Sequence, residues 1–154
     1  MTTSALSRRT DSALAILRVI AGTIFIAHGA QKLFVFGFAG VSGAFGQMGV
    51  PFPGLMGPFI ALLEFLGGIA LVIGLLTRLA SLGLTFNMLG AIALVHLKAG
   101  FFNPAGIEFP LALAGMNLAL VLAGAGAFSL DAVLANRRVK ATARATQPLW
   151  QKAA

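Results

Sequence analysis

The sequence predicts an all-α membrane protein: a four-transmembrane-helix bundle with a short outer interfacial helix and a basic cytoplasmic C-terminal helix. Three observations lead to this fold class. The 154 residues are 58% hydrophobic and only 10% charged, with a mean hydropathy of +0.95, which excludes an ordinary soluble domain. Four apolar segments each approach the roughly 20 residues that a helix needs to cross a bilayer. The positive charges gather at the chain ends and in one connection, as the positive-inside rule describes.

The four segments divide the chain into one membrane domain and two tails. We expect a cytoplasmic tail at residues 1–12, a four-helix membrane domain at 13–134 and a basic cytoplasmic tail at 135–154. The spans within this domain cover residues 14–36, 53–76, 79–97 and 109–128. With these spans assigned, the chain has no room for a soluble catalytic domain.

The first span is expected to begin after Ser12, a residue type that favours the N-cap of a helix. Gly22 and Gly29 fall on one face of this helix, which lets a neighbouring helix approach closely. Arg18 lies about 80° away from the face that carries the polar residues near the outer end. We therefore expect its guanidinium to reach the cytoplasmic headgroups.

The outer loop at 37–54 carries a glycine at every third position from 37 to 49. A short interfacial helix at 40–48 explains this pattern, with Gly49 and Pro51 ending it. The stripe that faces the lipid would consist of Val41, Ala44, Phe45 and Met48. We expect this helix to act as a lid over the outer mouth of the bundle.

The second and third spans are joined by Thr77 and Arg78 alone, so they must be antiparallel neighbours. After the fourth span, Ser129 is a candidate cap for a final basic helix, with Asp131 in its first turn. This helix is expected to lie on the cytoplasmic headgroups. Small residues that suit close contact between the second and third spans are Gly67, Gly68, Gly74, Gly83 and Gly90.

The distribution of cations predicts the orientation of the chain. With four spans, nine of the eleven Lys and Arg residues lie on one side of the membrane, so both termini are expected in the cytoplasm. The net charge of +7 then reflects attraction to anionic membrane lipid, and nucleic acid is not an expected partner. The nine cations are Arg8, Arg9, Arg18, Arg78, Arg137, Arg138, Lys140, Arg144 and Lys152, and the other two are Lys32 and Lys98.

Two residue patterns limit the chemistry of the chain. It has no cysteine, which removes disulfides, thiolate metal sites, iron–sulfur clusters and dithiol redox catalysis. Neither Glu64 nor Glu108 is followed three residues later by a histidine, as a carboxylate-bridged di-iron bundle requires. Haem between His28 and His96 is disfavoured because their expected depths differ by roughly 10 Å. We therefore predict no metal site, and any redox role would use another bound cofactor or a partner.

Ionisable and amide side chains occur in all four spans, where hydrocarbon does not tolerate a lone charge. These side chains should therefore turn inward and meet. A rise of about 1.5 Å per residue places them in two layers. The deeper layer contains His28, Glu64, Asn87 and Asn117, and the shallower layer near the lid contains Gln31, Lys32, His96 and Glu108.

Glu64 is the hardest of these residues to accommodate, because a carboxylate in hydrocarbon must share a proton or pair with His28 or Lys32. With His28 it is the candidate for proton handling, and all the residues of both layers are candidate ligand-binding groups. Phe34, Phe52 and Phe101 are candidate apolar walls for a flat aromatic ligand. Other interpretations stay open: the deep layer as packing between helices, and the shallow layer and the phenylalanines as interfacial anchors.

Several short motifs in this order resemble the DoxX family of small four-helix bacterial membrane proteins, over nearly all of residues 17–134. They are Arg18, Gly22 and Phe25 with His28-Gly29 and Lys32-Leu33-Phe34; Glu64 with Gly67-Gly68 and Gly74-Leu75-Leu76-Thr77-Arg78; His96 with Gly100-Phe101-Phe102; Glu108 before Pro110; and Ser129-Leu130-Asp131. The resemblance implies a multi-pass protein of the bacterial cytoplasmic (inner) membrane. It also implies a quinone-associated redox component, without implying that the chain is an enzyme by itself.

Three hypotheses about function follow from these observations. The first is an integral membrane redox-associated subunit that binds a quinone-like or other small flat ligand and works with a partner oxidoreductase. In this hypothesis His28, Lys32 and Glu64 surround the headgroup in the outer-leaflet half of the bundle, under the lid. The second is a small-solute transporter or permeation helper, and the third is a structural or assembly protein without a ligand. The ligand, the partner protein and any homo-oligomer stay open, with quinone as the candidate cofactor.

Overall fold

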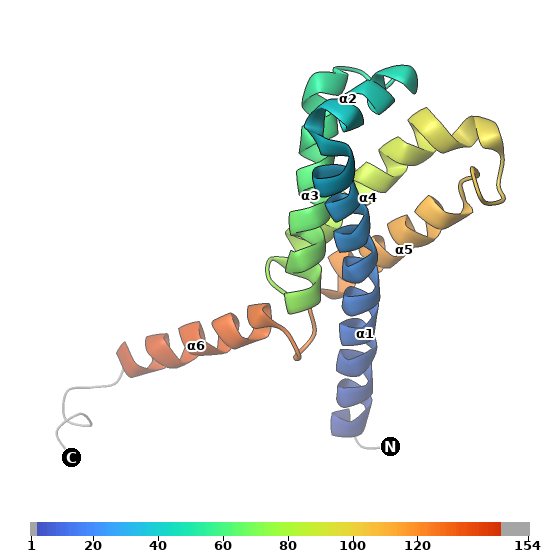
Figure 1. Ribbon diagram of the computed structural model, residues 1–154. Helices are drawn as coiled ribbons and strands as arrows, with labels where there is room; N and C mark the ends of the chain where they lie inside the picture. Colours follow the sequence, from blue (N-terminus) through green and yellow to red (C-terminus); the bar gives the residue numbers. More distant parts are fainter. Residues whose placement is uncertain (1–2, 146–154) are drawn as a thin grey trace, which may run out of the picture.

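The computed structural model describes residues 3–145, and every regular element in that range is a helix. In Figure 1, α1, α3, α4 and α5 form a bundle, with α2 crossing one end and α6 leaving the other. We call these the α2 end and the α6 end. In order, the elements are α1 (Thr3–Ala30), the π-helical turn η1 (Gln31–Phe36), α2 (Gly37–Gln47), α3 (Pro53–Ile73), α4 (Thr77–Ala91), the π-helical turn η2 (Ile92–His96), the short 3-10 helix η3 (Leu97–Ala99), α5 (Glu108–Ala123) and α6 (Leu130–Ala145).

Three helical stretches among the described residues are long and apolar enough to cross a membrane: Ser7–Gln47, Pro53–Ile73 and Thr77–Ala99. The prediction of an all-α membrane protein is confirmed. The predicted fourth span corresponds to α5, which has 16 residues and a length of about 24 Å. It is shorter than predicted because the helix ends at Gly124, where φ is 85°. A fourth crossing, and with it the side on which the termini lie, stays a prediction that labelling of the loops would test.

The first helix begins at Thr3, and Ser12 lies exposed within it, so the predicted start after Ser12 is wrong. At the opposite end Gly37, with a φ of 64°, redirects the chain into α2. The predicted short helix of this loop is therefore present, and it crosses the α2 end of the bundle (Figure 1). Val41 is buried because α2 packs on α3, so its predicted place on a lipid-facing stripe is wrong.

α1 and α3 touch each other at their glycines. A Cβ atom added to Gly29 would lie 2.4 Å from the backbone nitrogen of Phe65, and one added to Gly22 would lie 2.7 Å from the carbonyl oxygen of Gly68. Only glycine permits so close an approach of two backbones. The prediction that Gly22 and Gly29 admit a neighbouring helix is confirmed. The apolar core of the bundle consists of Ala21, Phe25, Leu71, Leu84, Met88, Leu113, Ala114 and Leu120.

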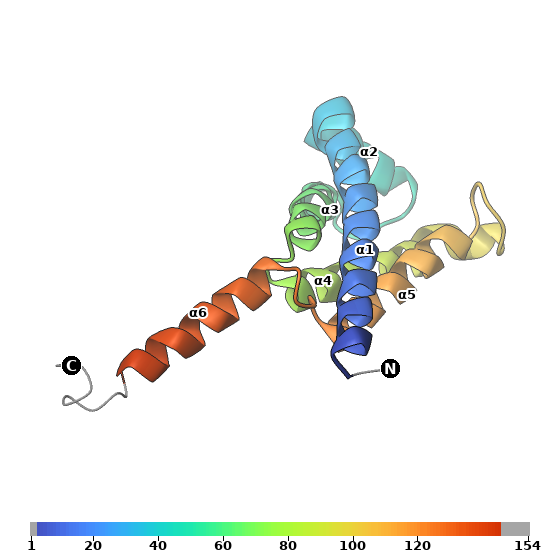
Figure 2. The same ribbon diagram turned by 90° about the horizontal axis from the view of Figure 1, so that it is seen from below.

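α3 and α4 are antiparallel neighbours, as predicted. Gly74, with a φ of 70°, ends α3, and Thr77 already begins α4. The connection is therefore 74–76, and the predicted connection at Thr77 and Arg78 is wrong. A Cβ atom added to Gly67 would meet the Leu84 side chain at 3.3 Å. Toward the α2 end α4 leans away from α3 and forms a hairpin with α5 (Figures 1 and 2).

The Arg18 side chain lies inside the bundle at its α6 end. Its guanidinium is buried and donates hydrogen bonds to the carbonyl oxygens of Leu71 at 3.1 Å and Phe128 at 2.5 Å. Buried charge requires such partners. The prediction that Arg18 reaches the headgroups is wrong, because these two carbonyl groups hold its side chain inside the protein.

The start of α6 is attached to the start of α4. The carboxylate of Asp131 accepts hydrogen bonds from the backbone N–H groups of Leu76 at 2.8 Å and Thr77 at 2.9 Å. Ser129 Oγ accepts from the N–H group of Ala132 at 3.1 Å, so the predicted cap of the final helix is confirmed. From this attachment α6 runs away from the bundle (Figures 1 and 2). Residues 146–154 of the predicted basic tail, with Lys152, lie outside the described residues.

Candidate functional site

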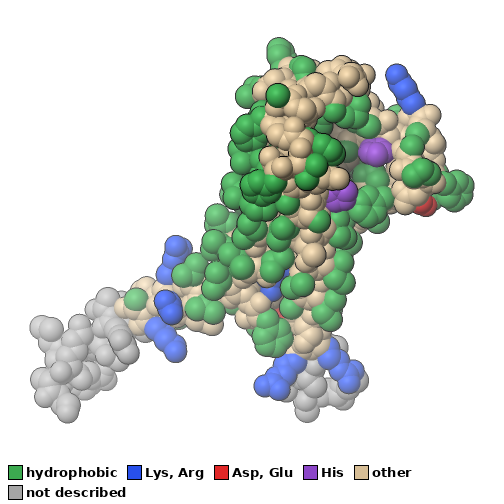
Figure 3. All heavy atoms as spheres, viewed as in Figure 1, with side chains coloured by type: hydrophobic (Ala, Val, Ile, Leu, Met, Phe, Trp, Pro, Cys, Tyr) green, Lys and Arg blue, Asp and Glu red, His purple; other side chains and the backbone are tan. Residues whose placement is uncertain are grey.

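A cavity of about 760 Å³ lies in the α2 end of the bundle. It forms where α4 and η2 lean away from α3, and residues of α1, α2 and α5 complete its wall. Figure 3 shows a hollow at this end, with histidine side chains beside it. The volume falls within the range of small-molecule sites in proteins.

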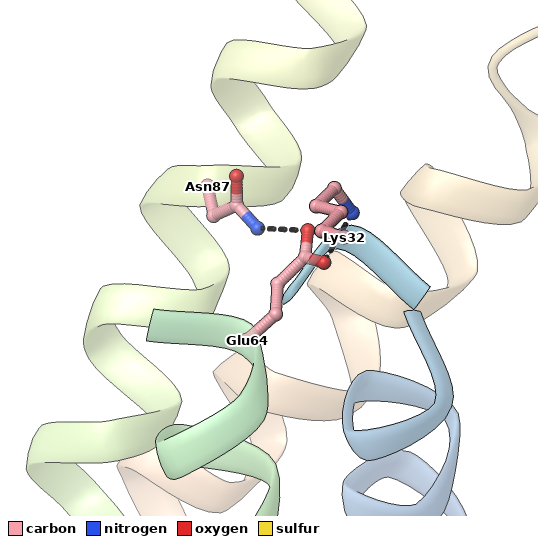
Figure 4. Close-up of polar contacts among 3 residues, drawn as sticks. All are labelled: Lys32, Glu64 and Asn87. Atoms are coloured by element: carbon pink, nitrogen blue, oxygen red, sulfur yellow. Dashed lines mark hydrogen bonds and ion pairs between the residues drawn. The ribbon is translucent and has the colours of Figure 1, made fainter. Parts of the chain in front are cut away.

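Three side chains from three helical segments form the polar centre of this cavity, and we call them the Glu64 triad (Lys32, Glu64 and Asn87). Glu64 lies in the middle part of α3 and is 4% exposed. One carboxylate oxygen pairs with the Lys32 ammonium, and the other accepts a hydrogen bond of 2.9 Å from the Asn87 amide (Figure 4). A carboxylate in an apolar bundle requires partners of this kind. The structure thus brings three of the predicted polar residues together.

Lys32 and His96 both project from π-helical turns, Lys32 from η1 and His96 from η2. A π turn adds a residue to the helical repeat and changes which side chains face the interior, and such turns are frequent at functional sites. The hydrophobic pattern of these two segments fits an α-helix equally well. Sequence reasoning therefore could not identify the turns.

Both histidines line the cavity. The exposed ring of His28 lies near Phe109, with ring centroids 6.1 Å apart and planes tilted by 48°. Nδ1 of His96 is 2.7 Å from the carbonyl oxygen of Ala105. A carbonyl oxygen can only accept, so Nδ1 carries a proton, and Nε2 of the neutral ring is left as an acceptor.

The aromatic wall of the cavity differs from the one that the sequence suggested. Phe34, Phe52 and Phe101 are exposed and do not line the cavity. Phe34 stands edge-on to Phe65, and Phe101 stands edge-on to Phe102. They lie at the surface because η1 and the loops direct them outward. The phenylalanines that line the cavity are Phe25, Phe45, Phe59, Phe86 and Phe109, accompanied by Met48, Met56 and Met88.

Weak signals in the sequence could have identified part of this wall. Phe25 precedes His28 by one helical turn and so shares its face. Phe86 and Phe109 directly adjoin the predicted polar residues Asn87 and Glu108. Phe45 and Phe59 lie on α2 and α3, two helices that pack on each other, and no local pattern indicated that these two rings would face the cavity.

The remaining predicted polar residues lie outside the cavity wall. Gln31 is exposed on η1. Glu108 accepts a hydrogen bond of 2.7 Å from the backbone N–H group of Asn103 and so orders its own loop. Asn117 is buried and donates to the carbonyl oxygen of Leu113 at 2.8 Å, on its own helix. Of the predicted deep layer, therefore, His28, Glu64 and Asn87 share the cavity and Asn117 does not.

The cavity combines hydrogen-bond donors with an apolar lining. Lys32 and His28 can donate, Glu64 and Nε2 of His96 can accept, and aromatic rings and methionine side chains surround them. Within residues 3–145, no three His, Asp or Glu side chains are placed to hold a metal ion. The arrangement can bind a flat, largely apolar molecule that carries a few acceptor oxygens.

Comparison with known proteins gives one family and several relatives. The profile of the DoxX family matches residues 13–97. The Bacillus subtilis (strain 168) protein named "Putative oxidoreductase CatD" is 38% identical over 108 residues, covering 68% of this chain and 75% of that protein. "Inner membrane protein YqjF" of Escherichia coli (strain K12) is 34% identical over 125 residues, covering 80% of this chain and 93% of that protein.

A third relative is "Uncharacterized membrane protein Rv3486" of Mycobacterium tuberculosis (strain ATCC 25618 / H37Rv). It is 30% identical over 139 residues, covering 83% of this chain and 85% of that protein. No solved structure matches the chain significantly. Two of these three relatives are thus named as membrane proteins, and the third is named for oxidoreduction.

Proposed function

This chain belongs to the DoxX family, and we propose that it is a redox-associated membrane subunit whose cavity binds a quinone-like flat ligand and which works with a partner oxidoreductase. One observation carries the proposal. Ordered hydrogen-bond donors and a wall of aromatic side chains occur in the same cavity of a membrane protein. This is the combination that a flat carbonyl compound dissolved in the membrane requires.

The donors of the site match the oxygens of a quinone. A quinone ring carries carbonyl oxygens that accept hydrogen bonds, and both the Lys32 ammonium and the His28 ring can donate. Lys32 can donate a further hydrogen bond to the quinone, because an ammonium carries three N–H donors and the pair with Glu64 does not use all of them. Phe25 and Phe109 offer apolar surface to the ring. Since Glu64 already orders Lys32, binding requires little rearrangement.

The same site can handle the protons of quinone reduction. Conversion of a quinone to a quinol consumes two electrons and two protons. In our proposal the partner oxidoreductase supplies the two electrons, while Glu64 and His28 take up two protons from water and pass them to the quinone oxygens. The relative named as an oxidoreductase supports a redox association for the family, and the relative named as an inner membrane protein supports that location.

We also propose that the α2 end lies in the outer leaflet and that both termini are cytoplasmic, with α5 as the fourth crossing. Figure 3 shows the Lys and Arg side chains of α6 and of the start of α1 toward the α6 end. The positive-inside rule favours the cytoplasm for that end. A small flat ligand would then bind in the outer-leaflet half of the bundle.

Binding of decylubiquinone to the purified protein in detergent tests the proposed function. We expect His28→Ala and Lys32→Ala each to weaken binding by about tenfold, the worth of one good hydrogen bond at about 1.4 kcal/mol. Gln31→Ala is the matched control, because Gln31 adjoins Lys32 but lies outside the cavity, and it should bind like wild type.

Unchanged binding in both folded variants would rule out this site. A folded wild type that binds no quinone, but takes up a small solute together with protons in liposomes, would favour transport instead. Absence of both activities would favour a structural role.

A further inference from the structure

We propose that the ligand of the cavity carries a long hydrocarbon tail, and that the tail leaves the cavity through a notch at Gly90, between α3 and α4. This inference rests on the proposed function, since it assigns a tail and an exit to the ligand of the same site. The ligand class is a lipid-soluble quinone, and the notch is the subsite for its hydrocarbon tail.

The notch lies in one stripe of side chains along α4 and η2. Phe86 and Gly90 are one helical turn apart on α4, Leu94 follows four residues later on η2, and all three line the cavity. Gly90 has no side chain, and a Cβ atom added to it would meet no other atom within 4 Å. The stripe therefore has a gap between two large side chains.

The side chains beside the gap stand at the outer edge of the cavity. Phe86 is 65% exposed, Leu94 is 49% exposed and Phe59 on α3 is 53% exposed, although all three line the cavity. A residue can both line the cavity and be exposed only where the cavity opens at the protein surface. In a membrane protein, an apolar surface along spanning helices faces lipid hydrocarbon.

The register of α3 and α4 places Gly90 and Phe59 at a similar level along the bundle. Glu64 contacts Asn87 through a hydrogen bond, and Gly67 faces Leu84, so each step along α3 is matched by an equal step back along α4. Three residues further along α4, this register puts Gly90 level with residue 61, which follows Phe59 by two residues on α3. Toward the α2 end α4 leans away from α3 (Figure 1), which widens the space between these two helices.

The polar head and the apolar tail of one ligand fit this arrangement together. Asn87 of the Glu64 triad precedes Gly90 by three residues on α4, so a ring held at the triad lies within one helical turn of the notch. The edge of the cavity at α1 and α5 instead carries the exposed ring of His28. A hydrocarbon tail is more stable at the edge formed by Phe59, Phe86 and Leu94, because that edge is apolar.

The test measures binding of two quinones to wild type and to Gly90→Leu in the same detergent. One is the tail-free dimethoxy-methyl-benzoquinone, and the other is decylubiquinone. Leucine fills the notch without a clash, since Gly90 has open space around it. We expect decylubiquinone to bind about tenfold more weakly to the variant, and the tail-free quinone to stay within about twofold of wild type. Partitioning of each probe into micelles cancels in the ratio of variant to wild type.

Gly115→Leu is the matched control, because Gly115 lies on α5, has equally open space around it and does not line the cavity. It should bind both quinones like wild type. If Gly90→Leu fails to fold, Leu94→Phe narrows the same notch from its other side and should give the same selective loss. Equal losses for both quinones, or no loss for either, would overturn the tail path. A wild type that binds neither quinone would overturn the proposed function and the tail path with it.

Discussion

Glu64→Leu is expected to destabilise the bundle by about 3 kcal/mol, because it leaves the Lys32 ammonium and the Asn87 amide at the polar centre without their shared acceptor. The free energy of unfolding in a mixed-detergent denaturation series measures this change. Glu64→Gln keeps one oxygen that can accept from Lys32 or Asn87 but loses the charge that pairs with Lys32, so we expect a smaller loss, of about 2 kcal/mol. The Gln variant should also fold normally and lose quinone-linked activity if Glu64 passes protons.

The double variant Lys32→Met with Glu64→Leu is the control for this interpretation. Removal of both charges leaves no unpaired ion, so the double variant should be more stable than Glu64→Leu alone. If Glu64→Leu is as stable as wild type, the triad does not contribute to stability. If Glu64→Gln retains full activity, Glu64 has no role in proton transfer.

Gly29→Ala is expected to have an effect of similar size, also about 3 kcal/mol. The added Cβ atom would lie 2.4 Å from the backbone nitrogen and 2.7 Å from the Cα atom of Phe65. Backbone atoms cannot rotate away, so α1 and α3 must separate along their whole contact. Thermal unfolding followed by circular dichroism in detergent measures the loss.

Gly115→Ala is the matched control for Gly29→Ala, since both glycines lie in apolar helices and only Gly29 is in close contact. Alanine is the better helix former by about 1 kcal/mol, so the control should be at least as stable as wild type. Equal stability of the two variants would show that α1 and α3 do not require backbone contact at Gly29.

Local physical constraints explain why part of the fold could be predicted from the sequence. Hydrocarbon does not tolerate a lone carboxylate, which is why Glu64 was expected to share a proton or to pair with His28 or Lys32, and its partner is Lys32. Glycines on one face of the first helix predicted a close neighbouring helix, and that neighbour is α3. The glycine pattern after residue 37 predicted a short helix in the loop, and α2 is present there.

Long-range geometry explains the differences. Arg18 is held by carbonyl oxygens of Leu71 and Phe128, which are distant in sequence, so its local surroundings suggested an interfacial side chain instead. The chain has thirteen phenylalanines, and the sequence pattern does not distinguish those that face the cavity from those at the surface. Only the packing of the helices determines which of them face the cavity. The end of α5 at Gly124 depends on a positive φ that a glycine permits but does not require.

Identification of the ligand that co-purifies from bacterial membranes tests the central claim most directly. Wild type and His28→Ala would be extracted with their surrounding lipid into polymer-bounded discs, and quinones would be quantified by mass spectrometry relative to protein and to lipid. Our account predicts that quinone is enriched with wild type over the level in the bulk membrane, and that His28→Ala lowers this enrichment. Equal quinone-to-lipid ratios in wild type, in His28→Ala and in the bulk membrane would contradict it.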